Sequence, residues 1–201
     1  MSNVYPSSPG FSGLKITSLQ PTLVSVAHSL ARQVRSRGGQ RWGIEATYPP
    51  NLTRAEAAPL LAFALQQRGQ FGIFTLVLHG QWASARGVAT GTPLVDLGSQ
   101  TGRTVNTKGW TASVTGILRA GDFLKFNGHA KVYMVTADVN STGAGLAAIP
   151  IEPALMAMPA NNEPVIVNNV PFTVSFASDA QNLQVMSAFF HEFKASFVEV
   201  V

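Results

Sequence analysis

The segment 119–153 constrains the fold more than any other part of the chain, because it predicts three short β-strands joined by tight turns. Residues 122–126 and 131–137 flank Asn127-Gly128, a dipeptide suited to the positive φ angles of a hairpin turn. A third strand, 146–151, follows a glycine-containing turn and ends at prolines, which cannot donate to a strand ladder. This segment therefore predicts a small, self-contained β-unit.

The N-terminal part of the chain predicts an extended arm followed by a long hairpin. Residues 1–21 contain three prolines with several serines and glycines, which favour an arm with little regular structure. Residues 22–37 are rich in Val and Leu with intermittent polar alternation, and Gly38-Gly39 is typical of a turn. Residues 40–48 are then expected to return as the second strand of the hairpin.

One helix is predicted after this hairpin. Thr53 and Glu56 have the spacing of a capping box, in which the Thr hydroxyl and the Glu carboxylate satisfy each other's backbone amides. Pro59 removes one backbone hydrogen bond near the start, and Arg68-Gly69 favours a stop. The apolar run 71–78 that follows predicts a buried strand.

From residue 85 to residue 154 the composition shifts to Gly, Thr and Val, which predicts short strands separated by turns. Besides the three strands already described, we expect strands at 87–90, 104–107 and 113–118. Short strands in this number, with turns between them, favour a small closed barrel.

The end of the chain predicts a return to an earlier sheet. Phe193, Ala195 and Phe197 alternate with polar residues at the period of a half-buried strand. A last strand commonly closes a sheet begun earlier, so we expect a discontinuous domain, residues 1–84 and 155–201, interrupted by a barrel of residues 85–154. The predicted fold class is mainly β with one helix, a discontinuous β-sandwich or barrel with a small β-barrel inserted.

The composition favours a protein that works in contact with partners. Charged residues make up only 12% of the chain, whereas about 25% is usual, and 46% of the residues are hydrophobic. Such a surface is usually covered in part by other proteins, so an oligomer or assembly component is favoured over a free monomer. The chain has no cysteine and therefore no thiolate chemistry.

Four arginines between residues 32 and 41 account for most of the clustered charge in a chain of net charge +4. They are Arg32, Arg35, Arg37 and Arg41. As a strand and turn they could display cations along one sheet face toward an acidic neighbour or nucleic acid, or they could protect a solvated hairpin tip. We favour an acidic protein neighbour or solvent.

The sequence predicts no enzyme, no catalytic residue, no cofactor and no metal site. The four histidines show no metal-ligand spacing; they are His28, His79, His129 and His191. Asp122 follows Gly121 in a predicted turn, where its carboxylate is expected to accept hydrogen bonds from nearby amides. No apolar run approaches the ~20 residues of a membrane span, so no membrane insertion is expected.

Several motifs together resemble the distal tail protein (Dit) family of long-tailed phages. The segment 40–78, with its Trp-bearing strand, prolines, capped helix and apolar strand, is similar to that family. The motifs GILRAGDF at 116–123, GHAKVYMVT at 128–136 and IPIEP at 149–153 resemble the inserted domain of the T-five-type member.

This resemblance implies a structural protein of the virion, placed at the phage tail tip and assembled in the host cytoplasm. It implies a homohexameric ring whose partners are itself, the tail tube protein and the baseplate hub protein, with genome DNA passing through the lumen. The arm 1–21 and the hairpin 22–48 are then expected to make the main subunit contacts. The insert would have an oligosaccharide/oligonucleotide-binding (OB) fold, with host glycan as one possible ligand.

Two alternatives remain open from the sequence. In the first, the barrel is an OB-type module that binds saccharide or single-stranded nucleic acid through basic and aromatic side chains. The available residues are Arg103, Lys108, Trp110, Lys125 and Lys131. In the second, the protein is another tail ring, such as a tail terminator.

Overall fold

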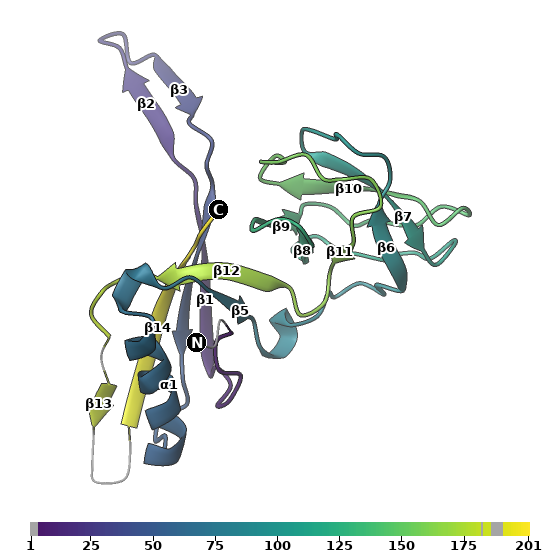
Figure 1. Cartoon of the computed structure of the whole chain (residues 1–201). Helices are drawn as coiled ribbons and strands as arrows, with labels where there is room; N and C mark the ends of the chain where they lie inside the picture. The colour runs from purple at the N-terminus through teal and green to yellow at the C-terminus, as the bar shows by residue number, and fades with distance from the viewer. Residues whose placement is uncertain (1–3, 182, 186–190) are drawn as a thin grey trace. The chain divides into compact units, whose positions relative to one another are not determined.

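The computed structural model describes residues 4–181, 183–185 and 191–201 (Figure 1). The described residues are mainly β with one α-helix, which confirms the predicted fold class. The chain divides into two compact units. One contains residues 1–10, 74–173 and 201, and the other contains residues 11–73 and 174–200.

The unit of residues 11–73 and 174–200 is built on an antiparallel sheet. Strand β1 (Gly13–Leu19) pairs with β4 (Arg41–Thr47), and β4 pairs with β14 (His191–Glu199). The other side of β14 pairs with β12 (Pro171–Phe176) and with β13 (Leu183–Val185). The predicted C-terminal strand that returns to an earlier sheet is therefore confirmed.

The helix α1 (Arg54–Gln66) covers part of this sheet and contacts β14. It begins at Thr53, where the capping box is present as predicted and Glu56 accepts the Thr53 amide at 2.9 Å. Its buried residues are Ala57, Leu60, Phe63 and Ala64. Pro59 lies within the first turns without ending the helix.

The chain leaves the helix through Arg68, whose φ of 56° is left-handed, and Gly69, with φ of 68°. The short 3₁₀ helix η1 (Gly69–Phe71) follows, and Asp179 accepts the Gln70 amide at 3.0 Å. The predicted stop at Arg68-Gly69 is thus confirmed. A side chain at position 69 would meet the Asp179 carboxylate, so glycine suits both the angle and the space.

The predicted hairpin at residues 22–48 is wrong in its turn and in its pairing. Strand β2 (Thr22–Val26) pairs with β3 (Arg32–Ser36), so the turn lies between them and not at Gly38-Gly39. The turn is closed by the Ala27 amide, which donates to the Ala31 carbonyl at 3.0 Å. It contains no glycine, and Leu30 takes the left-handed conformation, with φ of 62°.

Strand β4 pairs with β1 instead of with residues 22–37, so the predicted arm 1–21 contains a regular strand. The same segment is also anchored before that strand, because Tyr5 is buried and donates its amide to the Thr75 carbonyl at 2.8 Å. Phe11 packs edge-on against Tyr48, with ring centroids 5.4 Å apart. The arm described here is therefore largely part of the folded protein.

The unit of residues 1–10, 74–173 and 201 contains a nearly closed barrel (Figure 1). Its six strands follow the order β11-β8-β9-β10-β7-β6. They are β6 (Gly91–Val95), β7 (Thr104–Trp110), β8 (Phe123–Phe126), β9 (Val132–Val135), β10 (Ala147–Glu152) and β11 (Val165–Ile166). The two ends of this order meet where the Val95 amide donates to the Glu163 carbonyl at 2.9 Å and Leu94 forms a bridge with Pro164.

Two predicted strands of the barrel are wrong. Residues 87–90 and 113–118 form loops and turns, apart from an isolated bridge between Leu118 and Val139. Loops of this kind still contribute apolar residues to the barrel core, because Ile117 and Leu118 are fully buried. Apolar residues that are buried in a loop therefore gave the same sequence pattern as a strand.

The hairpin of β8 and β9 is confirmed, but its turn differs from the predicted one. Neither Asn127 nor Gly128 has positive φ; the loop is longer than two residues, and Glu163 accepts the Gly128 amide at 2.7 Å. The next turn does use glycine, because Gly145 has φ of 69° and its amide donates to Thr142. A Cβ at position 145 would also collide with the Trp110 carbonyl.

The elements at the start of this unit are β5 (Phe74–Val77) and the 3₁₀ helix η2 (Gly80–Trp82). The buried strand predicted at 71–78 is present only as β5, because Phe71 lies in η1 and is 82% exposed. Strand β5 also forms a parallel bridge to Val4. Among the helices that the structure describes, none combines the length and apolar character needed to span a bilayer.

Candidate functional site

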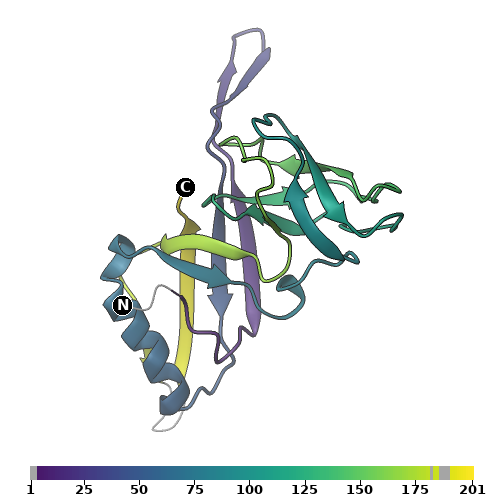
Figure 2. The ribbon, with the colours of Figure 1, turned by 45° about the vertical axis from the view of Figure 1, so that its right-hand side comes forward.

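The β2–β3 hairpin is the most exposed regular element of the described chain. Every residue of both strands is exposed, and the hairpin extends beyond the sheet of β1 and β4 in its own unit (Figure 2). A two-stranded hairpin without a packed face is marginally stable in water. The hairpin is therefore a candidate surface for contact with another protein.

The two faces of the hairpin differ in character. Residues directly opposite each other share a face, so Val24 and Val34 lie side by side, flanked by Val26. These three valines are 44%, 54% and 59% exposed, respectively. The opposite face has Leu23 but also the polar pair Ser25 and Gln33. The hairpin thus presents one apolar face, which we define by Val24, Val26 and Val34.

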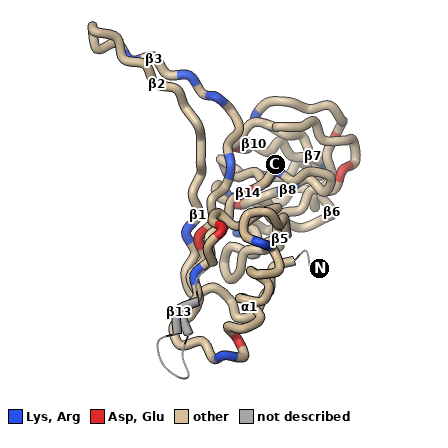
Figure 3. Tube along the Cα trace, turned by 60° about the vertical axis from the view of Figure 1, so that its left-hand side comes forward, with Lys and Arg blue, Asp and Glu red and all other residues tan. Residues whose placement is uncertain are grey.

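The hairpin is also strongly cationic. The first acidic residue in the chain is Glu45, so no carboxylate of the hairpin itself offsets its arginines (Figure 3). Arg32 lies on the valine face opposite Val26, whereas Arg35 lies on the other face opposite Leu23. The arrangement of all these cations along a single sheet face is therefore wrong, and both faces carry positive charge.

The barrel does not present the basic aromatic surface that the OB-type binding alternative requires. Trp110 is buried, and its Nε1 donates to the Thr107 hydroxyl at 2.8 Å, so it cannot stack on a ligand base. Lys125 is buried, and its Nζ donates to the Pro171 carbonyl at 2.8 Å. Lys131 is buried as well.

The two remaining cations of that set are paired with acids of the same unit. Arg103 lies 2.6 Å from the Glu152 carboxylate, and Lys108 lies 3.3 Å from Asp96. The five residues are therefore not gathered into one open site, and this alternative gains no support from them.

Asp122 has the structural role that the sequence predicted. Its Oδ2 accepts the Arg119 amide at 2.7 Å and the Gly87 amide at 3.3 Å, and its Oδ1 accepts the Arg86 amide at 2.9 Å. The side chain is only 2% exposed. The carboxylate therefore joins two loops of the barrel, and its acceptor positions are occupied.

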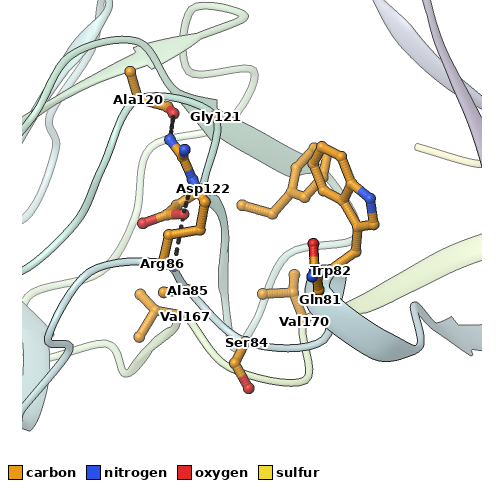
Figure 4. Close-up of a pocket in the computed structure, with 11 residues that line it drawn as sticks. Gln81, Trp82, Ser84, Ala85, Arg86, Ala120, Gly121, Asp122, Val167 and Val170 are labelled. Carbon is orange, nitrogen blue, oxygen red and sulfur yellow. Dashed lines mark hydrogen bonds and ion pairs between the residues drawn. The ribbon is translucent and has the colours of Figure 1, made fainter.

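A pocket lies beside this carboxylate in the same unit (Figure 4). Its volume is about 340 Å³, and its walls include Gln81, Trp82, Arg86, Phe123 and Val170. The Arg86 guanidinium donates to the Ala120 carbonyl, and its Nε lies 3.7 Å from Asp122. The pocket thus combines an aromatic wall with a fixed guanidinium.

The described histidines do not form a metal site. No group of three potential ligands occurs among the residues that the structure describes. Burial lowers the pKa of His79, and His129 lies 3.7 Å from Glu163 in an ion-pair geometry. The side chain of the fourth histidine, His191, lies outside the described part of the chain.

Two exposed carboxylates have lowered pKa values. The pKa of Asp138 is lowered first by the hydrogen bond from the Ala120 amide and then by the Arg119 side chain, which donates at 2.5 Å. The pKa of Glu56 is lowered by the hydrogen bond from the Thr53 amide. Both groups stabilise local structure, one at a barrel loop and one at the helix start.

Residues 83–170 match the family described as distal tail protein pb9, B domain. The matched segment contains all six strands of the barrel. This similarity supports a relation to the phage distal tail proteins and a structural role in the phage tail. No curated protein matches the chain.

The sequence predicted a hairpin in this region, although with a wrong turn and a wrong pairing, and it missed two features of the site. The valine face was not identified, because it depends on the register of β2 against β3, which the misplaced turn concealed. The pocket at Trp82 was also missed, since its walls come from segments about 40 residues apart or more, around positions 82, 122 and 168.

Proposed function

We propose that this chain is a structural protein of the phage tail tip, which forms a hexameric ring joining the tail tube to the baseplate hub. In this proposal an inserted OB-type barrel, which the sequence placed at residues 85–154 and which in the structure also includes β11, interrupts a ring domain formed by the N- and C-terminal parts of the chain. Genome DNA passes through the lumen without specific binding. The observation that carries the proposal is the match of the barrel to the pb9 B domain.

The β2–β3 hairpin supports self-association as the way in which the ring forms. Its valine face has no cover among the described residues, and burial of an exposed valine in a neighbour stabilises an interface by roughly 1 kcal/mol. A ring contact is heterologous, so the valine face would pack on a different surface of the next copy. The flanking arginines would then lie at the rim of the contact, where charge favours correct docking more than affinity.

The direct test compares two pairs of substitutions on opposite faces of the hairpin. Val24→Ser with Val34→Ser removes the apolar pair, whereas Ser25→Ala with Gln33→Ala changes the neighbouring pair on the other face. We expect the valine variant to weaken assembly about fivefold per valine and the control variant to keep the ring, as measured by light scattering over a concentration series. A full-size ring from the valine variant would refute the hairpin contact.

Removal of the first dozen residues is a less specific test of assembly. That deletion also removes buried Tyr5 and the packing of Phe11 on Tyr48, so the ring and the fold would weaken together. We expect a smaller ring population with a lowered unfolding midpoint. An unchanged ring mass would show that the arm makes no important subunit contact.

The position in the particle tests the remaining part of the proposal. Labelling of the protein in intact virions, imaged by electron microscopy, is expected to mark the tail tip between the tube and the hub. Label at the head-proximal end of the tail would instead favour the tail terminator alternative. Material that remains monomeric at high concentration and is absent from virions would overturn the structural role.

A further inference from the structure

We propose that the pocket of about 340 Å³ beside Trp82 is a binding site for a neutral pyranose sugar. The pocket belongs entirely to the unit that contains the barrel, and Figure 4 shows its lining side chains. The proposal does not depend on ring formation, because no residue of the hairpin contributes to the pocket. Three properties of the walls point to this class of ligand.

The first property is an exposed aromatic wall. Trp82 is 48% exposed although it packs on Phe123, with ring centroids 5.9 Å apart and a tilt of 47°. Phe123 is itself held by Phe172 in an edge contact at 5.2 Å, so Trp82 rests on a packed support. An indole in this state offers an apolar surface with little entropy left to lose. The C–H face of a pyranose ring is the part of a sugar that packs on such a surface.

The second property is a polar wall with donors and acceptors. The Arg86 guanidinium is fixed by the Ala120 carbonyl and by Asp122, yet it has five N–H groups, more than these two partners use. The Gln81 amide makes no hydrogen bond to another described side chain and can both donate and accept. Sugar hydroxyls need partners of both kinds, and an amphipathic pocket with a few fixed polar groups supplies them.

The third property is the charge balance, which favours a neutral ligand. Arg86 is the one cation among the described residues that line the pocket, and Asp122 offsets it at 3.7 Å. A phosphate or carboxylate would need additional positive charge. The volume is near the lower end of the range for ligand pockets, about 300–1,000 Å³, which suits one or two sugar rings.

The expected affinity is weak, as is usual for a single sugar ring on an open surface. From the efficiency of small ligands, methyl glucoside is expected to bind with a dissociation constant of about 1 mM. The experiment uses the full chain and neutral methyl glycosides of glucose, galactose and N-acetylglucosamine as probes. Chemical shifts of the backbone amides are followed by NMR during each titration.

The expected result is that at least one glycoside shifts the amides of residues 81–86 and 120–123 with saturation in the millimolar range. Trp82→Ala and Arg86→Met should each weaken binding at least tenfold. Val88→Ala is the matched control, because Val88 is 58% exposed in the same unit and does not line the pocket. Trp82→Phe keeps an aromatic wall and should retain part of the affinity, which separates ligand contact from a folding defect.

Three results with the glycosides would overturn the proposal. The first is the absence of chemical-shift changes at about 10 mM of every glycoside, a concentration tenfold above the expected dissociation constant. The others are chemical-shift changes confined to residues outside the pocket, and binding by Trp82→Ala as strong as that of the unchanged protein. Stronger binding of glucuronate or inorganic phosphate than of the glycosides would show an anion site instead. Ring mass, measured in parallel, distinguishes failure of this proposal from failure of the ring assembly.

Discussion

The barrel and the β2–β3 hairpin both contain antiparallel strand pairs, but apolar side chains are buried in the barrel and exposed in the hairpin. All four residues of β8 are buried, whereas every residue of β2 is exposed. The β8–β9 pair has further strands on both sides, β11 and β10, while β2–β3 forms a sheet of its own. The same local structure therefore becomes a core or an interaction surface according to what surrounds it.

This contrast indicates where stability and assembly reside. The barrel core contains fifteen buried apolar residues in one cluster, which gives the unit a hydrophobic core of its own. The hairpin adds apolar area that the isolated chain leaves in water, so under the proposed ring assembly its contribution is gained on association. Mutations in the two regions are expected to affect different measurements.

The largest expected effect on the free energy of unfolding comes from a substitution in the barrel core. Phe126 is fully buried, and Phe126→Ala should lower the free energy of unfolding by about 3–5 kcal/mol through lost burial and a cavity. Val24→Ala in the hairpin should change it by no more than about 0.5 kcal/mol in the monomer. Urea unfolding at low protein concentration measures both. Similar losses in the two variants would show that the hairpin is packed in the free chain.

A smaller loss of stability is expected when the buried carboxylate of the barrel is removed. Asp122→Ala leaves three backbone amides without their carboxylate acceptor, and we expect a loss of about 2–3 kcal/mol. Asp138→Ala is the matched control, because it removes a carboxylate on the surface that also accepts a loop amide. The control should shift the urea midpoint much less. Equal shifts would mean that burial of Asp122 has little energetic importance.

The smallest effect concerns the helix outside the barrel and depends on pH. The pKa of Glu56 lies below its ordinary value of 4.5 because the Thr53 amide donates to the ionised carboxylate. The stabilisation is therefore fully present above pH 4.5 and is lost as the pH falls through the lowered pKa. Glu56→Gln should reduce the urea midpoint slightly at neutral pH and not at strongly acidic pH. A difference that persists in acid would contradict an electrostatic cap.

The helix shows how far local sequence determines structure in this chain. Thr53 and Glu56 satisfy each other's amides across three residues, and no distant partner is needed for this contact. Asp122 is a second case, because a carboxylate in a turn finds amides within a few residues, here that of Arg119. Its further bonds to Arg86 and Gly87 come from a distant loop and could not be predicted.

The wrong prediction of a hairpin at residues 22–48 shows which features local sequence patterns do not determine. Gly38 and Gly39 do have positive φ angles of 71° and 70°, so the conformation inferred from them is correct. They join β3 to β4, however, and the strands that they connect do not pair with each other. The actual turn contains Leu30 in a left-handed conformation, which its residue type does not indicate.

By itself, the sequence determined that the protein is mainly β with one capped helix and a turn-rich β-unit, because turn chemistry, caps and periodicity act over a few residues. Only the tertiary structure decided that β4 pairs with β1, that Val95 and Glu163 complete the barrel, and that three valines share an uncovered face. Strand partners and register depend on contacts between distant segments. Several pairings satisfy the same local pattern equally well, and packing of the whole chain selects one.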